Sequence, residues 1–289
     1  MVKICGGIVL FNPDVDRLEK NIKSVRSQVQ ELILIDNGSK NIEEFSFLIN
    51  KYNCKIIYNY ENKGIAYALN QLLTISNSNN YEWILTLDQD SIVSSSIISH
   101  FVENIQENIA IICPKISSSV SKEETNNLSN ELIDKCITSG SFTNIKKAIL
   151  VGGFDEKMFI DLVDFEFCFR IKQFEYEILR DNREILNHQY GNEEKIEILY
   201  YLGEKIKSDK IKQFAIKKNY NEIRNYYYLR NSLYFIKKHK KNINNLVYLK
   251  KLLNFIIHMF LIEDNKFKNL ITLYRAIKDY KAMKDEDYK

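Results

Sequence analysis

The chain has 289 residues and a formal net charge of +3, and hydrophobic residues make up 45% of it against 27% charged residues. This balance, with only 2 prolines and 9 glycines, excludes a disordered or fibrous protein, and the length allows one large α/β domain with a smaller appendage or two modest domains. The 5 cysteines are scattered without a C-x-x-C pair, so we expect reduced thiols in a cytosolic protein.

Neither end of the chain carries a pattern typical of a membrane span. The first stretch, MVKICGGIVLFNPD, is broken by Asn12 and Pro13 and indicates a strand rather than a secretory signal. The most apolar late stretch, Leu246–Ile262, is interrupted by two lysines, an asparagine and a histidine. We therefore expect a cytoplasmic protein, with the inner face of the cytoplasmic membrane as a site of peripheral attachment.

The first half of the chain alternates short apolar runs with helical patterns. We predict strands at Ile4–Phe11, Leu32–Ile35, Lys55–Asn59, Trp83–Leu87 and Ala110–Pro114. Between them, apolar residues recur at helical spacing in three sets: Leu18, Ile22 and Val25; Phe45, Leu48 and Ile49; and Ile65, Ala68, Leu69, Leu72 and Leu73. Strands and helices in alternation predict an α/β fold, with a mostly parallel sheet covered by helices on both faces.

Two polar motifs directly follow predicted strands. DNGS (Asp36–Ser39) follows LILI, and DQDS (Asp88–Ser91) follows WILTL. Because ligands of open parallel sheets bind outside the carboxyl ends of the strands, we expect the two motifs to meet at one sheet edge. Asp36 would there accept hydrogen bonds from a nucleotide base or ribose, although a tight turn with Gly38 at positive φ also explains DNGS.

The two aspartates of DQDS are the clearest chemical signal in the sequence. An extended backbone would direct Asp88 and Asp90 to the same side, where two carboxylates cannot both ionise in a dry crevice without a nearby cation. Mg²⁺ or Mn²⁺ commonly uses one or two carboxylates together with the phosphate oxygens of a substrate. The alternative is an Asx-type turn that caps a helix beginning near Ser95.

Three further segments follow along the chain. NKGIAYALN (Asn62–Asn70) places a glycine directly before a helix of small residues, which allows a ligand or another backbone to approach closely. Residues 117–130 are polar and predict an exposed loop. SGSF (Ser139–Phe142) indicates either a tight turn or a support for a ligand, with Gly140 permitting close approach.

An acidic segment, GGFDEKMFIDLVDFEFCFR (Gly152–Arg170), leads into a predicted helix. Within this segment Asp164 is the better candidate for a catalytic carboxylate, because Asp161 also fits a helix N-terminal cap favoured by the macrodipole. The predicted inner face of the helix consists of Phe167, Cys168, Ile171 and Phe174.

The last third of the chain, after a boundary near residue 192, is helical, basic and rich in aromatic residues. Its charge indicates an anionic partner. The basic and aliphatic segment FIKKHKKNINNLVYLKKLLNFIIHMF indicates amphipathic helices that can lie on an anionic membrane surface.

These motifs, in this order, resemble the family 2 glycosyltransferases of GT-A fold, and within them the bacterial rhamnosyltransferase-like subgroup. The resemblance covers roughly the first two-thirds of the chain and rests on DNGS, NKGIAYALN, LDQDS, SGSF, GGFDEKMFIDLVDFEFCFR and HQYG. It implies a GT-A catalytic domain at residues 1–192, with a nucleotide-sugar half at about 1–115 and an acceptor and base half at about 131–192, and a helical C-terminal region at residues 193–289.

The implied activity is inverting, metal-dependent transfer of a sugar from a nucleotide diphosphate donor to an acceptor hydroxyl. Asp164 matches the general base of the family, although Val163 stands where the common E-D-x-D pattern has Glu. Rhamnosyltransferase-like members share the V-D-x-E form, which favours L-rhamnose from dTDP-rhamnose as the donor sugar. The implied acceptor is a saccharide, a lipid-linked precursor of a cell-surface polysaccharide.

The resemblance also assigns ligand-binding residues. Asp88 and Asp90 match the D-x-D pair that binds Mg²⁺ or Mn²⁺, and His188 is a third candidate metal ligand, although a lone histidine is more often packed or exposed. Asp161 and Glu166 would lie on the acceptor side. The candidates for nucleotide and donor binding are Phe11, Asn12, Asp36, Asn37, Asn62, Gly64, Asn70, Asp88, Gln89, Ser139, Gly140 and Arg230.

Two other enzyme classes lack their expected motifs in this sequence, whereas the donor sugar and a non-catalytic role remain open. A Rossmann dehydrogenase would need a G-x-G-x-x-G turn after the first strand, and a nucleotidyltransferase would need a glycine-rich basic loop near the N-terminus; both are missing. The donor could be another nucleotide sugar, such as a UDP-hexose or UDP-galactofuranose. From a different class, the chain could be a non-catalytic module that binds a membrane surface or nucleic acid; we expect no nucleic-acid partner.

Overall fold

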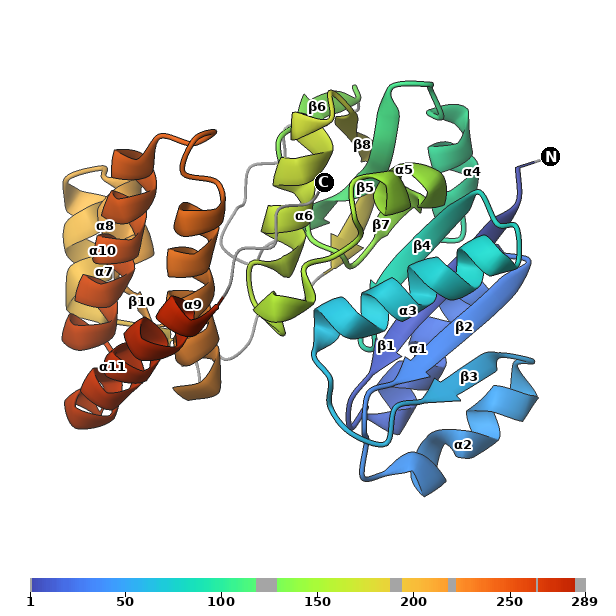
Figure 1. Ribbon diagram of the computed structural model, residues 1–289, viewed down its shortest axis with the longest axis horizontal. Helices are drawn as coiled ribbons and strands as arrows, with labels where there is room; N and C mark the ends of the chain where they lie inside the picture. Colours follow the sequence, from blue (N-terminus) through green and yellow to red (C-terminus); the bar gives the residue numbers. More distant parts are fainter. Residues whose placement is uncertain (1, 118–128, 188–193, 218–221, 264, 284–289) are drawn as a thin grey trace. The chain divides into compact units, whose positions relative to one another are not determined.

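The computed structural model describes residues 2–117, 129–187, 194–217, 222–263 and 265–283, and it forms two compact units (Figure 1). The first unit comprises Met1–Phe159 and Val163–His188, and the second comprises Ile160–Leu162 and Gln189–Lys289. Three residues in the middle of the sequence therefore belong with the C-terminal unit. His188, a predicted metal ligand, and most of the predicted 117–130 loop lie outside the described residues.

An eight-stranded sheet forms the centre of the first unit, with the strand order β3-β2-β1-β4-β7-β5-β8-β6. Its strands are β1 (Ile4–Leu10), β2 (Glu31–Asp36), β3 (Lys55–Tyr58), β4 (Trp83–Asp88), β5 (Ile109–Ser117), β6 (Glu131–Ile133), β7 (Ser141–Asn144) and β8 (Glu177–Asn187). The pairs β1–β2, β1–β4, β2–β3 and β5–β8 are parallel, whereas β7 runs antiparallel to β4 and β5, and β6 antiparallel to β8. All the predicted strands are present, and the predicted mostly parallel α/β sheet is confirmed.

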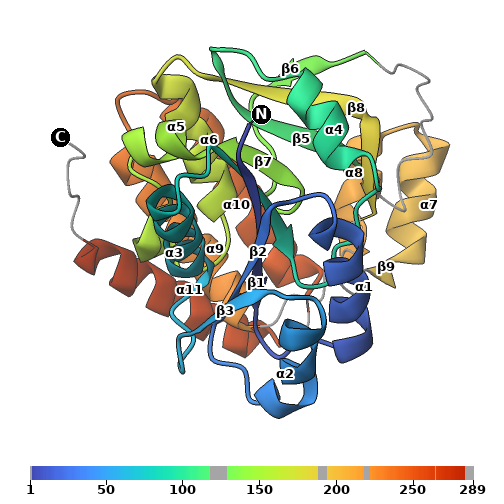
Figure 2. The same ribbon diagram turned by 90° about the vertical axis from the view of Figure 1, so that its right-hand side faces the viewer.

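Helices cover both faces of this sheet (Figure 2). They are α1 (Val15–Arg26), α2 (Ile42–Lys51), α3 (Ile65–Ser78), α4 (Ile97–Glu103), α5 (Ile145–Leu150), the 3₁₀ turn η1 (Glu156–Met158) and α6 (Val163–Gln173). The apolar faces of α1, α2 and α4 join one large core cluster with β1, β2 and β4, while α3 lies on the opposite face. Burial of this apolar surface is the main force that holds the strands and helices together.

The helical spacings predicted from the sequence correspond to buried faces, with one exception. Leu18, Ile22 and Val25 of α1 are fully buried, as predicted. Helix α6 buries Phe167, Cys168 and Ile171 but ends at Gln173. The prediction that Phe174 completes the inner face is wrong, because this residue follows the last helical turn and is 48% exposed.

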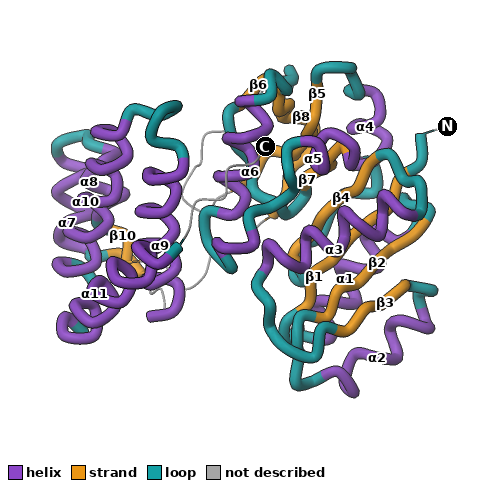
Figure 3. The backbone as a smooth tube through the Cα atoms, in the orientation of Figure 1, coloured by secondary structure: helices purple, strands orange, loops and turns teal. Residues whose placement is uncertain are grey.

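The second unit is mainly helical (Figure 3). Its elements are β9 (Glu194–Lys195), α7 (Glu197–Lys205), α8 (Asp209–Phe214), β10 (Ile216–Lys217), α9 (Glu222–Lys238), α10 (Asn245–Leu261) and α11 (Lys266–Ala282). Its apolar core joins Leu229 of α9, Leu252 and Met259 of α10 and Ala276 of α11. Among the described residues, none of the helices combines the length and the apolarity that crossing a membrane requires.

A buried polar cluster anchors β8 to α4. The side chain of Asp181 is fully buried and accepts hydrogen bonds from Asn104 Nδ2 at 2.7 Å, from the Arg183 backbone N–H at 3.0 Å and from Arg183 Nη2 at 2.8 Å. Burial by itself raises the pKa of Asp181, but the Arg183 side chain and backbone outweigh it, so the net pKa lies below the ordinary value.

This cluster predicts a pH-dependent stability. Because the folded-state pKa of Asp181 is lowered, its contribution is fully present above the unfolded-state pKa of about 3.9 and is lost as the pH falls through the folded-state pKa. Asp181→Asn should lower the free energy of unfolding by about 1–3 kcal/mol near neutral pH, and the difference should shrink in acid. Urea unfolding across this pH range measures it, with the exposed Asp134→Asn as control; a pH-independent difference would contradict the assignment.

Candidate active site

The carboxyl ends of three parallel strands align at one edge of the sheet. In the β1–β2 pair Leu10 lies opposite Asp36, and in the β1–β4 pair Val9 lies opposite Asp88. DNGS and DQDS therefore flank the end of β1 on either side, as predicted from the sequence. Since β1 is the point at which the strand order reverses direction, this edge is the topological switch point where open α/β sheets bind ligands.

Gln89, between the two aspartates, joins DQDS to the end of β1. Its Oε1 accepts a hydrogen bond from the Phe11 N–H at 2.8 Å, and its Nε2 donates to the Phe11 carbonyl at 3.3 Å. One amide side chain thus satisfies both backbone groups of Phe11 just beyond the strand. The ring of Phe11 is 45% exposed and is available to a ligand at this edge.

The backbone of DQDS is fixed by side chains from two other segments. From α1, Asn21 Nδ2 donates to the Asp88 carbonyl at 2.5 Å and Arg17 Nε donates to the Asp90 carbonyl at 2.6 Å. From the SGSF turn, the buried Ser139 hydroxyl accepts the Asp88 N–H at 3.0 Å. The loop is therefore held through its peptide groups, which leaves side-chain chemistry to the carboxylates.

The carboxylates of DQDS suit a divalent cation that also binds substrate oxygens. Both Asp88 and Asp90 are partly exposed, and no described residue donates to or pairs with the Asp90 carboxylate. The described residues contain no group of three or more His, Cys, Asp or Glu side chains that could hold a metal. A pair of carboxylates, completed by water and phosphate oxygens, is the arrangement that Mg²⁺ commonly uses, so Asp88 and Asp90 fit such an ion.

DNGS forms a tight turn around a buried carboxylate. Asp36 is fully buried, and its oxygens accept hydrogen bonds from the Gly38 N–H at 3.3 Å and the Ser39 N–H at 3.2 Å. Ser39 Oγ accepts the Asn12 N–H at 2.8 Å, and Asn12 Oδ1 accepts the Lys40 N–H at 2.8 Å. The turn proposed as the alternative for DNGS is thus present, and it is joined to the loop that follows β1.

An amide network connects DNGS to NKGIAYALN. Asn37 Nδ2 donates to Asn62 Oδ1 at 3.1 Å and to the Gly64 carbonyl at 3.2 Å, while Asn37 Oδ1 accepts from Asn59 Nδ2 at 3.2 Å and from the Lys63 N–H at 3.1 Å. Asn37 is 3% exposed, and its side chain bonds residues outside the DNGS turn. It fixes the path of the chain from β3 into α3.

Gly64 and Asn70 join α3 to the acidic segment. Gly64 has φ +87°, and a Cβ there would lie 2.6 Å from the Phe159 ring, so the site needs glycine. The next residue, Ile65, donates its N–H to the Phe159 carbonyl at 2.7 Å. The Asn70 amide pairs with the backbone N–H and carbonyl of Phe154 at 2.7 and 2.9 Å. These contacts give Asn70 a structural partner in the first unit.

Asp164 lies in the first turn of α6 and is partly exposed. Its Oδ1 accepts the Phe165 N–H at 2.8 Å. The preceding Val163 is 4% exposed, so the position at which the common pattern carries Glu is here an apolar core position. A carboxylate at that position would lose its hydration, which gives a physical reason for valine.

Glu166, predicted on the acceptor side, is fully buried, and its carboxylate pairs with Arg170 of the same helix. Both of its oxygens accept hydrogen bonds from Arg170 Nε, at 2.8 and 2.9 Å, and Nη2 contacts Oε2 at 2.6 Å. Arg170 also donates to the carbonyls of Val151 and Gly153. The pair therefore fixes the Gly-Gly turn ahead of the acidic segment.

Asp161 and Arg230 belong to the second unit. Asp161 has φ +63°; its Oδ1 pairs with Arg224 Nη2 at 3.0 Å, and its buried Oδ2 has no hydrogen-bond partner among the described residues. Asn231 Nδ2 donates to the carbonyls of Ile160 and Asp161 at 2.8 and 2.9 Å. Arg230 donates to Asn231 Oδ1 and lies 4.6 Å from the centre of the Tyr227 ring. Their predicted roles toward acceptor and donor stay predictions.

Sequence reasoning missed the residues that hold the site together. Arg17, Asn21 and Asn231 donate to backbone carbonyls far away in the sequence, and Asn59 donates to the side chain of Asn37. A signal existed for Asn21 only, since a polar residue between Leu18, Ile22 and Val25 interrupts the apolar face of α1 and is fully buried. Arg17, Asn59 and Asn231 have polar neighbours in the sequence, so the pattern does not single them out.

The family model for glycosyl transferase family 2 matches residues 7–160. The dTDP-rhamnosyl transferase RfbF of Shigella flexneri is 26% identical over 248 residues, which cover 80% of this chain and 78% of RfbF. The structure of the mannosyltransferase PcManGT from Pyrobaculum calidifontis, in complex with GDP-Man and Mn²⁺, superposes with a TM-score of 0.58 at 11% identity, covering 98% of this chain and 76% of PcManGT. TarS 1-349 of S. aureus, in complex with UDP-GlcNAc, superposes with a TM-score of 0.54 at 12% identity, covering 96% and 80%.

The sheet, its covering helices and these superpositions define the GT-A fold. The chain belongs to glycosyl transferase family 2, because the family model matches more than half of it. It is therefore an enzyme that transfers a sugar from a nucleotide-sugar donor, as the motifs predicted.

The buried Glu166–Arg170 pair predicts a large effect of removing one partner. Arg170→Met should lower the free energy of unfolding by about 3–5 kcal/mol, because it removes the guanidinium that pairs with the buried Glu166 carboxylate. The double variant Glu166→Leu/Arg170→Met should be less destabilised than the single variant, and chemical denaturation measures both. A single variant as stable as the double one would show that the charge of Glu166 is compensated elsewhere.

Proposed function

We propose that the enzyme transfers L-rhamnose from dTDP-rhamnose, with inversion at the anomeric carbon, to a hydroxyl of a saccharide acceptor. The V-D-F-E segment at Val163–Glu166 and the 26% identity to RfbF support this donor over a UDP-hexose or UDP-galactofuranose. The observation that carries the proposal is the DQDS loop: its backbone is held by three side chains, while the Asp90 carboxylate is left without a described partner.

The nucleotide end of the donor binds, in this proposal, at the edge formed by β1, β2 and β4. The nucleotide would lie against the exposed Phe11 side chain and the loop that the Asn12–Ser39 hydrogen bond holds. Asp88 and Asp90 would hold Mg²⁺ or Mn²⁺, and PcManGT, which shares the fold, was solved with Mn²⁺. When bound, such an ion neutralises the negative charge that develops on the departing nucleoside diphosphate.

Asp164 is proposed as the general base. It accepts the proton of the acceptor hydroxyl while the acceptor oxygen forms a bond to the anomeric carbon and the bond to the diphosphate oxygen breaks. A single displacement of this kind inverts the anomeric configuration and needs one base and no nucleophilic side chain. The position of Asp164 in the first turn of α6, partly exposed, supports the role, because a base must reach its substrate.

We further propose that the acceptor is the lipid-linked precursor of a cell-surface polysaccharide, approached from the inner face of the cytoplasmic membrane. The catalytic domain would extend over residues 1–192 and the helical region over 193–289. Support comes from α10, where apolar side chains remain exposed along one helical stripe: Leu246, Leu249, Leu253, Ile257 and Leu261. A helix with such a stripe and neighbouring lysines can lie on an anionic surface.

Loss of the Asp90 charge should weaken the donor binding that depends on the cation. Asp90→Asn keeps the shape of the side chain, and we expect transfer to fall about 10²–10³-fold, as when one electrostatic contact to the leaving group is removed. Calorimetric titration with dTDP in the presence of Mn²⁺ should show weaker binding. Asp16→Asn, an exposed substitution on α1, is the control, and unchanged turnover in Asp90→Asn would refute the metal assignment.

Asp164→Asn should separate catalysis from binding. Transfer should fall about 10²–10⁴-fold, the usual contribution of a positioned base, while the affinity for dTDP stays at the wild-type value. A parallel loss of dTDP affinity would place Asp164 in donor binding and contradict its role as base.

Removal of divalent ions should identify donor and cation together. In EDTA, we expect nucleotide sugars to give no thermal stabilisation, and addition of Mn²⁺ or Mg²⁺ should restore it through mass action. In a panel of dTDP-rhamnose, UDP-glucose and UDP-galactofuranose, dTDP-rhamnose should stabilise the fold most and be hydrolysed fastest. A larger effect of either UDP-sugar would overturn the proposed donor but not the family.

A further inference from the structure

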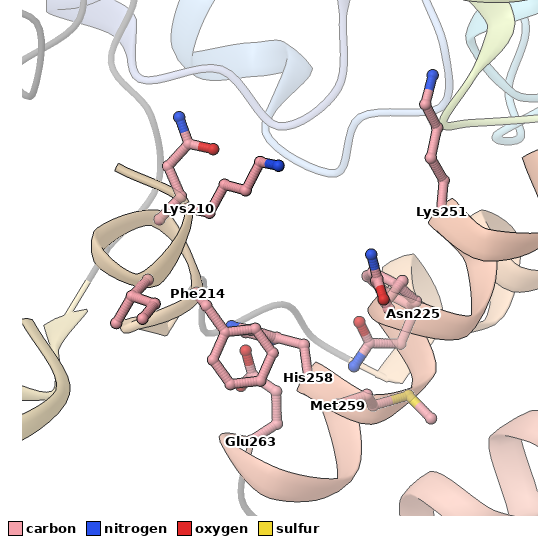
Figure 4. Close-up of a pocket in the computed structure, with 11 residues that line it drawn as sticks. Lys210, Phe214, Asn225, Lys251, His258, Met259 and Glu263 are labelled. Carbon is pink, nitrogen blue, oxygen red and sulfur yellow. The ribbon is translucent and has the colours of Figure 1, made fainter. Parts of the chain in front are cut away.

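The helical unit contains a pocket that the proposed transfer reaction does not use. It has a volume of about 770 Å³ and lies between α8, α9 and α10 (Figure 4). Pockets of about 300–1,000 Å³ are typical of sites for small organic ligands. All its lining residues lie in the second unit, so the pocket is a property of that unit alone.

The floor of the pocket is apolar and held in place by internal contacts. Phe214 of α8 and Phe255 and Met259 of α10 line it. His258 Nε2 donates to the Ile216 carbonyl at 3.0 Å, and its ring meets the Phe214 ring edge to face, with centroids 5.2 Å apart. The side chains at the bottom are therefore positioned before any ligand arrives, which reduces the entropy cost of binding.

Two lysines stand on opposite sides of the pocket (Figure 4). Lys210 comes from α8 and Lys251 from α10; both are exposed, and neither has a carboxylate within 4.0 Å in the described part of the chain. The Lys251 ammonium lies 4.9 Å from the centre of the Tyr248 ring. Glu263 is the acidic residue in the described lining, so the two ammonium groups leave an excess of positive charge.

A buried amide also faces this space. Asn225 of α9 is 5% exposed and lines the pocket, yet its side chain makes no hydrogen bond with any described residue. The polar atoms of this amide are not among the fully buried polar atoms that lack a partner, so they keep contact with the solvent-filled space of the pocket. An amide that reaches the pocket beside an apolar floor can form a hydrogen bond with a polar atom of a ligand.

We propose that this pocket binds a single-chain amphipathic phosphate. The hydrocarbon chain lies on the floor formed by Phe214, Phe255 and Met259, the phosphate lies between Lys210 and Lys251, and Asn225 donates a hydrogen bond to an oxygen at the junction of the two parts. The site does not depend on which sugar the enzyme transfers or on Asp90 and Asp164, so it can be tested without turnover.

The test is calorimetric titration of the full chain with octyl phosphate, inorganic phosphate and 1-octanol as separate probes. Octyl phosphate should bind at least tenfold more tightly than either of the others, because only it uses the floor and the lysines together. If inorganic phosphate bound equally well, the site would be a surface anion site. If octanol bound equally well, the lysines would contribute nothing to binding. Either result overturns the proposal.

Adjacent lysines supply a matched control. Lys251→Ala should weaken octyl phosphate binding about fivefold, the equivalent of about 1 kcal/mol for one exposed charge pair, and leave octanol binding unchanged. Lys250→Ala removes the same charge from an exposed position that does not line the pocket and should have no effect. Equal losses in the two variants would show attraction by net charge alone and overturn the proposal.

A blocking substitution distinguishes the pocket from the exposed apolar stripe of α10. Asn254 lines the pocket and is exposed, so Asn254→Trp can place a ring in the cavity with little effect on the fold. It should abolish octyl phosphate binding, whereas Lys250→Trp should not. Thermal unfolding of both variants verifies that they fold, and retained binding in a folded Asn254→Trp would refute the site.

Discussion

The register of β1 with its two neighbours is the constraint on which the candidate active site depends. It sets Leu10 opposite Asp36 and Val9 opposite Asp88, so both acidic loops begin at the same level of the sheet. A slip by one residue would turn every side chain of β1 to the other face, where Ile8 and Leu10 would leave the main core cluster. Burial of that core thus fixes the active-site edge as well as the fold.

Given this edge, the loops are held by amides rather than by charges. Gln89 satisfies both backbone groups of Phe11, and Asn37 accepts and donates across the loop before α3. Neutral amides can fix a backbone without adding to the local charge, whereas a lysine in their place would pair with the aspartates. Asp90 keeps its carboxylate available as a result, and two adjacent carboxylates then favour a divalent cation.

Hydrophobic periodicity predicted the first half of the fold because β1 to β4 and α1 to α3 alternate with short connections. It gave no signal for β6, β7 and β8, since β7 is a short strand of mixed residues, Ser141–Asn144, inserted antiparallel between β4 and β5. The site motifs were recognisable from their position after strands. The assignment of Ile160–Leu162 to the second unit was not recognisable, because these residues contact side chains far away in the sequence, Asn231 and Arg224.

The V-D-F-E segment shows how a departure from the family pattern can be compatible with the same chemistry. Val163 is buried in the core and Glu166 is used inside α6, so of the acidic positions in the segment only Asp164 is partly exposed in the first unit. Arg170 ties Glu166 to the carbonyls of Val151 and Gly153, and Asn70 ties the following Phe154 to α3. A buried ion pair of this kind contributes little net stability but has a strict geometry. Its effect is to fix where α6 begins, and the start of α6 determines the position of Asp164, the proposed base.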